Sequence, residues 1–153
     1  MLDKIKSLLD AQGVEYREVH HAPTRTSEEA ADARGEDLSI GGKALVVKID
    51  DSFRLFVLSA SKRIDSAKVK RYFRAKKIRF ATEQELGVLT DLVPGSVPPF
   101  GKPLFALELY VDRTIVNNEK IAFNAGSLTD SIIMRVKDYV RIAKPEIFDF
   151  SKS

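Results

Sequence analysis

Lys43 is the residue of this sequence that is best placed to do chemistry. It follows Gly41 and Gly42 and precedes the apolar, β-branched run 44–49, which is typical of a central strand. A lysine at the rim of an apolar strand face can point into a cleft, where its ammonium would bind a phosphate or polarise a carbonyl. The alternative is a strand-end lysine that carries its charge into solvent. A Walker-type phosphate loop is excluded, because Ala44 stands where that motif requires serine or threonine.

Two loops could present hydrogen-bond donors to a carbonyl or a developing oxyanion. Residues 95–101 contain two glycines and two adjacent prolines, which set a rigid backbone path that could hold amides against a ligand. Residues 124–127 end an apolar run with a side-chain amide, backbone N–H groups and a hydroxyl in one place. Taken alone, each loop is better explained as a structural turn.

Other catalytic and metal-binding chemistry finds little support in the sequence. The chain has no cysteine, and its only histidines, His20 and His21, are adjacent, so on a strand they would point to opposite sides. The Gly-x-Ser-x-Gly elbow of serine hydrolases does not occur. We therefore expect no metal and no cofactor, although one histidine could line a pocket.

These groups need a scaffold of mixed helices and strands. Helical spacing and capping residues predict helices at 2–12, 27–34, 83–89 and 137–143, and a basic helix that Asp65 caps. Strands are expected at 14–19, 44–49, 53–58, 78–80, 104–111, 120–124 and 132–136. Hairpins at 44–58 and 104–124, the second turning at Asn117-Asn118, favour an α/β (α+β) fold with a compact, largely antiparallel mixed sheet. The tail after Pro145 is expected to be loosely held.

Length and composition favour one domain over residues 1–153. The apolar fraction of 44% is ordinary for a globular protein, and no apolar run approaches the roughly 20 residues that cross a bilayer. The first residues lack the pattern of a signal peptide. We expect a cytoplasmic protein with no membrane partner.

Charge is distributed unevenly along the chain. Between positions 62 and 79 there are nine basic residues against one acid, Asp65. Such one-sided density predicts contact with a polyanion, and the alternative is a solvated helix face. The residues that we assign to nucleic-acid binding are Lys62, Arg63, Lys68, Lys70, Arg71, Arg74, Lys76 and Lys77.

The order of several short motifs is more specific than any one of them. The sequence resembles the YbaK family, the free-standing relatives of the editing domain that is inserted in bacterial prolyl-tRNA synthetases. The matching pieces span roughly residues 14–138 and include His21-Ala22-Pro23, Thr26-Ser27-Glu28-Glu29-Ala30, the lysine strand from Gly42, Lys62-Arg63-Ile64-Asp65, Leu89-Thr90, Gly95-x-x-x-Pro99-Phe100-Gly101, Tyr110-Val111-Asp112, Phe123-Asn124-Ala125-Gly126-Ser127 and Ser131-Ile132.

The resemblance implies a function and a site. The chain would be a deacylase that hydrolyses, in trans, the ester of a tRNA mischarged with alanine, cysteine or serine, with proline tRNA as the expected carrier. Lys43 would be catalytic, and the substrate would be bound by His21, Thr26, Gly95, Ser96, Pro99, Phe100, Gly101, Asn124, Gly126 and Ser127. The partners would be aminoacyl-tRNA and, as an open question, a synthetase, and the oligomeric state is left open.

Two other functions are compatible with the same residues. The basic segment and a vestigial pocket would also suit a tRNA- or RNA-binding module without catalysis. A hydrolase of small aminoacyl esters or amides, for which tRNA is neither bound nor needed, is the third reading. Replacement of Lys43 by alanine separates them, because only the deacylase would lose turnover while it still bound RNA.

Overall fold

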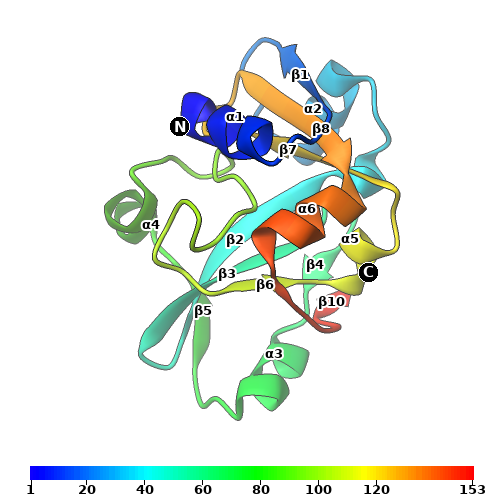
Figure 1. Ribbon diagram of the computed structural model, residues 1–153. Coiled ribbons are helices and arrows are strands. Elements are labelled where there is room, and N and C mark those ends of the chain that lie inside the picture. The colour runs from blue at the N-terminus through cyan, green and yellow to red at the C-terminus, as the bar shows by residue number, and fades with distance from the viewer.

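A twisted five-stranded sheet forms the centre of the computed structural model, which describes residues 1–153 (Figure 1). Its strand order is β5-β2-β3-β6-β9. The antiparallel hairpin of β2 (Gly42–Ile49) and β3 (Ser52–Ser59) is extended by β5 (Ile78–Phe80), antiparallel to β2, and on the other side by the parallel strands β6 (Leu109–Val111) and β9 (Glu146–Ile147). The edge strand β5 is short, so it pairs with only the last three residues of β2.

A second sheet and a two-stranded ribbon complete the β structure. The second sheet has the order β1-β8-β7, with β1 (Tyr16–His20), β8 (Asp130–Arg135) and β7 (Lys120–Asn124) all antiparallel. The ribbon joins β4 (Arg63–Ile64) to β10 (Ser151–Lys152). The start of β2 and the end of β7, which precedes a turn, are therefore each fixed by a sheet.

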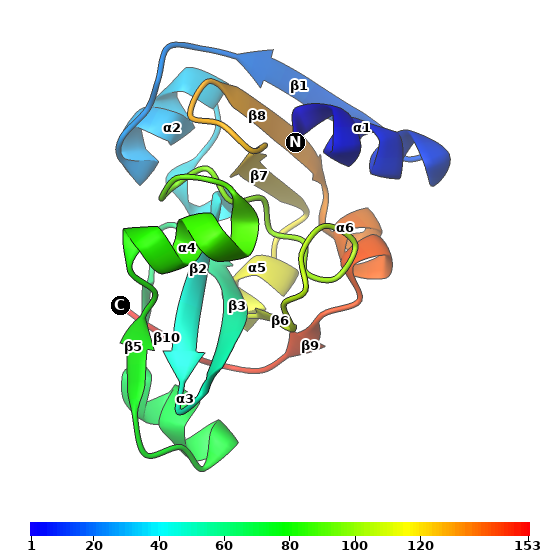
Figure 2. The ribbon, with the colours of Figure 1, turned by 90° about the vertical axis from the view of Figure 1, so that its left-hand side faces the viewer.

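Six α-helices surround the sheets. They are α1 (Leu2–Ala11), α2 (Ser27–Arg34), α3 (Ser66–Phe73), α4 (Glu83–Thr90), α5 (Arg113–Val116) and α6 (Val136–Ala143), and a 3₁₀ turn, η1 (Leu38–Ile40), precedes β2. Figure 2 shows α4 above β5, with α3 at the far end of the molecule. None of the helices is long and apolar enough to span a membrane.

The two faces of the central sheet contribute to separate cores. Alternation along β2 sends Val46 into a core of 22 buried residues that also includes Ile5 of α1, Phe123 of β7 and Tyr139 of α6. The opposite face sends Val47 and Ile49 into a core of 8 buried residues shared with α3 and the C-terminal segment. Lys43 and Leu45 lie on this second face, because they alternate in step with Val47.

Most local predictions agree with the structure, and the mixed α/β fold class is confirmed. The helix predicted at 27–34 is α2, which Thr26 caps by accepting a hydrogen bond from the N–H of Glu29 at 3.1 Å. The capping box that starts α4 is present at Thr82 and Glu85. The hairpin predicted at 44–58 is β2 and β3, one or two residues longer at each outer end.

The prediction of a strand at 104–111 and of a hairpin at 104–124 is wrong. Only residues 109–111 are a strand, because the N–H groups of Leu104 and Phe105 both donate to the carbonyl of Gly101 and form a turn. Asp112 then caps α5 through a bond from the Thr114 N–H at 3.0 Å, so a helix stands where a hairpin arm was expected. β6 and β7 consequently belong to different sheets.

The expectation of a loosely held tail is also wrong. Phe150 is fully buried, and its N–H donates to the Asp112 carboxylate at 2.7 Å. Its ring packs edge-on against Phe56, with 5.1 Å between the ring centroids. The tail is part of the second core, which local sequence rules do not reveal.

Candidate active site

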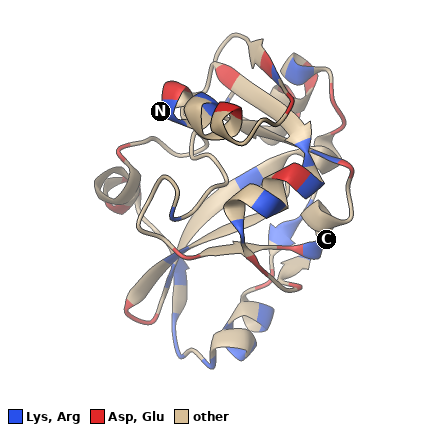
Figure 3. Cartoon of the chain, in the orientation of Figure 1, with Lys and Arg blue, Asp and Glu red and all other residues tan.

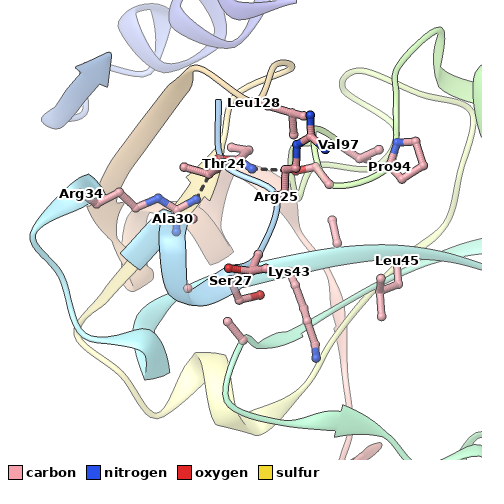
Figure 4. Close-up of a pocket in the computed structure, with 17 residues that line it drawn as sticks. Thr24, Arg25, Ser27, Ala30, Arg34, Lys43, Leu45, Pro94, Val97 and Leu128 are labelled. Carbon is pink, nitrogen blue, oxygen red and sulfur yellow. Dashed lines mark hydrogen bonds between the residues drawn. The ribbon is translucent and has the colours of Figure 1, made fainter. Parts of the chain in front are cut away.

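A cavity of about 500 Å³ lies where α2, the start of β2 and the loops after α4 and β7 meet (Figure 4). Its walls include both faces of β2, since Ala44 and Leu45 each line it. The lining residues are Thr24, Arg25, Thr26, Ser27, Ala30, Arg34, Gly41, Gly42, Lys43, Ala44, Leu45, Ala60, Pro94, Gly95, Val97, Asn124 and Leu128. Three of them are cations and none is an acid, so the cavity suits a neutral or anionic ligand.

Lys43 is the cation on the β2 wall. Its ammonium is half-buried and donates a hydrogen bond to the carbonyl of Lys62, and no carboxylate lies within ion-pair distance of it. In Figure 4 the side chain runs away from the end of the cavity that Thr24 and Arg34 line. Burial, and secondarily the charge of Arg63, lower the pKa of Lys43 below its ordinary value of 10.5.

The backbone offers donors on two sides of the cavity. Gly95 has φ of +86°, and its N–H has no hydrogen-bond partner. On β2, the Ala81 N–H donates to the Val46 carbonyl at 2.9 Å, beyond the end of β5. Because backbone groups alternate along a strand, the N–H and carbonyl of Ala44 point to this same edge, in the gap between β5 and the bridge that joins Gly41 to Ala122 of β7.

A buried polar network supports the wall on the α2 side. The Arg34 guanidinium donates from Nε to Ser131 Oγ at 2.9 Å and from Nη2 to Asn124 Oδ1 at 3.0 Å. Asn124 in turn donates from Nδ2 to the Gly95 carbonyl at 2.7 Å. His21 joins through a 2.8 Å hydrogen bond between its Nε2 and Ser131 Oγ. The network therefore links α2, β7, β8 and the loop at Gly95.

Arg34 and Thr24 were not predicted as site residues. Arg34 is only 7% exposed and has no carboxylate partner, and burial lowers its pKa to about 10. The Thr24 hydroxyl is buried with no hydrogen-bond partner in the protein. Neither residue has a local sequence signal. The hydrogen-bond acceptors of Arg34 are 90 and 97 positions away, and the backbone partner of Thr24 is Leu128.

The structure brings together four of the residues predicted from the sequence. Lys43, Thr26, Gly95 and Asn124 all line the cavity, although the Thr26 hydroxyl serves as the cap of α2. His21, Ser96, Pro99, Phe100, Gly101, Gly126 and Ser127 do not line it.

The second half of the loop at 95–101 anchors the loop to the core instead of contacting the cavity. Phe100 is fully buried and packs edge-on against Phe123 and Tyr139, with centroid distances of 5.6 and 5.3 Å. The carbonyl of Pro99 accepts from the Tyr139 hydroxyl at 2.5 Å. A side chain at Gly101 would lie 2.7 Å from the Leu107 carbonyl. We correct the prediction that these three residues contact substrate.

The polar groups of the turn after β7 make hydrogen bonds within the protein. The Gly126 N–H, expected as a donor to substrate, donates to the Ser96 carbonyl at 3.0 Å. The Ser96 hydroxyl donates to the Val93 carbonyl at 2.8 Å, and the Ser127 hydroxyl donates to Asp130 at 2.6 Å. These groups are satisfied within the protein, so they hold the loop at Gly95 in place but are not available to a ligand.

The basic segment, whose lysines and arginines are blue in Figure 3, supplies residues to two separate places in the fold. Lys70, Lys76 and Lys77 line a groove together with Lys48 and Arg79, and we call these five residues the basic groove. Lys62, Arg63 and Lys68 lie at the C-terminal ribbon, where Arg63 and Lys68 each donate at 2.9 Å to the carbonyls of Ser153 and Ser151. Arg71 and Arg74 line neither the groove nor the cavity.

The sequence of this chain is similar to those of a known protein family. The aminoacyl-tRNA editing domain family matches residues 21–142. The chain is 32% identical, over 98% of its length and 92% of the relative's, to the multifunctional Ser/Thr-tRNA deacylase ProXp-y of Escherichia coli K12. It is 36% identical to the proline–tRNA ligase of Shouchella clausii over 67% of this chain, which corresponds to only 18% of the ligase.

The fold comparison agrees with the sequence comparison. The crystal structure of the hypothetical protein APE2540 superposes with a TM-score of 0.87 at 26% sequence identity, over 97% of this chain and 99% of that one. The order of motifs in the sequence, the fold and the matched residues all support the same assignment. The chain belongs to the aminoacyl-tRNA editing domain family, as the resemblance of its motifs predicts.

Proposed function

We propose that this protein is a deacylase that hydrolyses, in trans, the ester of a tRNA mischarged with a small amino acid. Membership of the editing-domain family and the deacylase name of the E. coli relative support the reaction. The match extends over 98% of this chain for that relative, compared with 71% and 67% for two proline–tRNA ligases, so the deacylase is the better guide to the reaction.

The observation that carries the proposal is the combination of unpartnered donors and cations in a cavity that has no acid. An ester of tRNA brings its own assistance, because a vicinal ribose hydroxyl can orient or activate water. The protein then needs to position the ester and stabilise the oxyanion. The unpartnered N–H of Gly95 is suited to that role, since Asn124 holds the carbonyl of the same residue and thereby anchors the loop at this position.

Lys43 and Arg25 would hold the anionic part of the substrate. Both lie on the cavity wall, on β2 and before α2 respectively, and neither is in an ion pair. The terminal nucleotide of a tRNA carries a phosphate, which an ammonium or guanidinium binds through charge-assisted hydrogen bonds. Lys43 is the catalytic residue of our proposal, because it is the ammonium on the β2 wall of the cavity and would bind either this phosphate or the ester carbonyl.

The wall at Thr24 suggests which small amino acid is bound. Its buried hydroxyl lacks a partner in the protein, and a ligand side chain that carries a hydroxyl group would supply one. The side chain of alanine has no hydroxyl, whereas those of serine and threonine do. We therefore propose serine and threonine as the preferred amino acids, in agreement with the name of the E. coli relative. Alanine, cysteine and a proline tRNA carrier are the alternatives that the following experiment compares.

Replacement of Thr24 by valine tests this specificity. Valine keeps the shape of threonine but removes the hydroxyl, so hydrolysis of seryl- and threonyl-tRNA should fall roughly tenfold while that of alanyl-tRNA is unchanged. The measurement is kcat/KM on a panel of labelled alanyl-, cysteinyl-, seryl-, threonyl- and prolyl-tRNAs, each on cognate and proline tRNA. An equal loss on every ester would show that Thr24 does not read the side chain.

Asn124→Ala tests the role of the polar network. The substitution frees the Gly95 carbonyl and removes an acceptor of the buried Arg34, so we expect kcat to fall at least tenfold and stability to fall by about 1–3 kcal/mol. Asn118→Ala is the matched control, because Asn118 is also a partly buried asparagine whose side chain makes hydrogen bonds, here two that it donates at 3.1 Å to carbonyls, and it does not line the cavity. Equal activity losses in the two variants would reduce Asn124 to a general structural role.

The binding-module alternative is tested by the same panel. If every ester survives while tRNA binds in a salt-sensitive way, the chain is an RNA-binding module without catalysis. The proposal also includes contact between tRNA and the predicted basic residues, a single domain over residues 1–153, a synthetase partner and a cytoplasmic location.

A further inference from the structure

We propose that Phe80 stacks on the unpaired base that precedes the terminal nucleotide of the tRNA, and that the β2/β5 edge guides this single strand from the cavity to the basic groove. The inference rests on the proposed function, because it assigns a path to the RNA that carries the ester. It concerns a residue that neither the cavity nor the basic segment includes.

Phe80 is an aromatic ring left open to water. Its side chain is 59% exposed at the end of the edge strand β5, and no other aromatic ring packs against it. A single exposed apolar side chain is ordinary on a protein surface. Its position between two cationic sites is what indicates a ligand.

The first of these sites is the cavity. Phe80 is paired with Val47 of β2, so its ring lies on the sheet face that also carries Leu45 and Lys43. Both of those residues line the cavity. From Val47 to Leu45 the strand advances about 7 Å, so the ring stands next to the cavity along the same edge.

The second site is the basic groove. Ile78, two residues before Phe80 on the same face, lines this groove. Of its two acids, Asp50 is occupied, since its carboxylate accepts from the N–H groups of Lys76 and Lys77 at 3.0 and 2.9 Å.

The lysines of the groove remain available to a phosphate. Lys48, Lys70, Lys76 and Lys77 are in no ion pair, whereas Arg79 is paired with Glu85 at 2.7 Å. Asp51 is the one acid of the groove that makes no side-chain hydrogen bond or ion pair. The groove therefore keeps an excess of positive charge that complements a nucleic-acid backbone.

The order along the edge is cavity, aromatic ring, basic groove. A stacking ring beside a cationic groove is the arrangement that binds single-stranded nucleic acid without reading its sequence. A base-paired end would hide the face of the base from Phe80. The single-stranded 3′ end of a tRNA, whose last nucleotide would sit in the cavity, fits this order.

Binding of an uncharged RNA minihelix tests the stacking directly. The minihelix has four unpaired 3′ nucleotides, with 2-aminopurine in place of the base before the last. The wild type should quench its fluorescence, and Phe80→Ala should lose the quenching and bind about 5- to 150-fold more weakly. Phe80→Trp should keep both. Val88→Ala, at a side chain that is 88% exposed on α4, should behave as the wild type.

A second comparison separates stacking from a general defect. Phe80→Ala should lower kcat/KM on the seryl ester of the minihelix but not on the seryl ester of adenosine alone, which lacks the preceding base. Equal losses on both esters, unchanged binding of the minihelix, or an equal loss on a blunt-ended duplex would each overturn the proposal. If the wild type hydrolyses no ester but the Phe80-dependent quenching persists, the proposed function fails and the RNA path stands.

Discussion

Alanine in place of Lys43 is expected to lower kcat for ester hydrolysis by about 100- to 1,000-fold, the effect of removing one preorganised charge or donor from a developing oxyanion. Tight binding of uncharged tRNA should change only a few fold, since the basic groove lies farther along the β2/β5 edge. Folding should be unaffected, because the ammonium makes a single bond, to the Lys62 carbonyl. Single-turnover hydrolysis and tRNA binding, measured on the same preparations, check both parts.

Two further variants sharpen the Lys43 experiment. Lys102→Ala removes an exposed lysine that is paired with Glu108 at 2.8 Å and does not line the cavity, so it should leave turnover unchanged. Lys43→Arg keeps the charge but changes its geometry, and we expect partial activity. Unchanged turnover in Lys43→Ala would remove Lys43 from the site and leave the backbone donors at Gly95 and Ala44 as the candidates.

The lowered pKa of Lys43 also gives a pH dependence. If the ammonium is the active form, its contribution is fully present below the lowered pKa and is lost as the pH rises through it. The decline should therefore begin at a lower pH than the ordinary 10.5 of lysine. After subtraction of uncatalysed hydrolysis, Lys43→Arg should lack this alkaline decline, because arginine stays charged.

The largest effect on stability is expected from Asp112→Asn. The carboxylate accepts four hydrogen bonds, from the Thr114 N–H and hydroxyl at 3.0 and 2.5 Å, the Phe150 N–H at 2.7 Å and the Ser151 hydroxyl at 2.8 Å. An amide would turn an N–H₂ group toward these donors. We expect the free energy of unfolding to fall by about 3 kcal/mol, as for the loss of a charged acceptor from a buried network. Denaturant unfolding measures this loss.

The C-terminal tail should respond to the same substitution. Because Asp112 holds both Phe150 and Ser151, the variant should become sensitive to limited proteolysis after Pro145. Asp149→Asn is the matched control, since Asp149 is an exposed acid of the same tail that forms an ion pair with Arg113 at 3.2 Å. Its loss should cost less than about 1 kcal/mol. Similar losses in the two variants would contradict the role given to Asp112.

The stability difference should depend on pH. Burial raises the pKa of Asp112, but the hydrogen bonds from Thr114, Phe150 and Ser151 together outweigh it and hold the pKa below its ordinary value of 3.8. A lowered pKa stabilises the fold above the pKa of the unfolded chain, and this stabilisation is lost as the pH falls through the folded value. The wild type and Asp112→Asn should therefore differ fully near pH 7 and converge below about pH 4.

Several elements were predictable from the sequence because neighbouring residues determine them. Thr26 and Thr82 start their helices through hydrogen bonds to residues three positions away, and Asp65 caps α3 in the same way. The hairpin of β2 and β3 follows from two apolar runs joined by a short polar turn. The order of motifs around Lys43, Gly95 and Asn124 was sufficient to identify the family.

Predictions from the sequence were wrong where the interacting residues lie far apart in the chain. The segment 104–111 has the composition of a strand, but the packing of Gly101 and the cap at Asp112 leave only β6. Phe100 was predicted to contact substrate, yet contacts with Phe123 and Tyr139 place it in the core.

The polar wall of the cavity was decided by tertiary structure alone. Arg34 donates hydrogen bonds to Asn124 and Ser131, which lie 90 and 97 positions away in the sequence. The Thr24 hydroxyl is buried by the surrounding chain and has no hydrogen-bond partner in the protein. Phe80 faces the cavity edge because β5 pairs with β2 in one register. Local sequence thus determined which helices and turns form and which family the chain joins. Long-range packing decided which polar groups reach the cavity, because burial and hydrogen-bond partners are properties of the assembled fold.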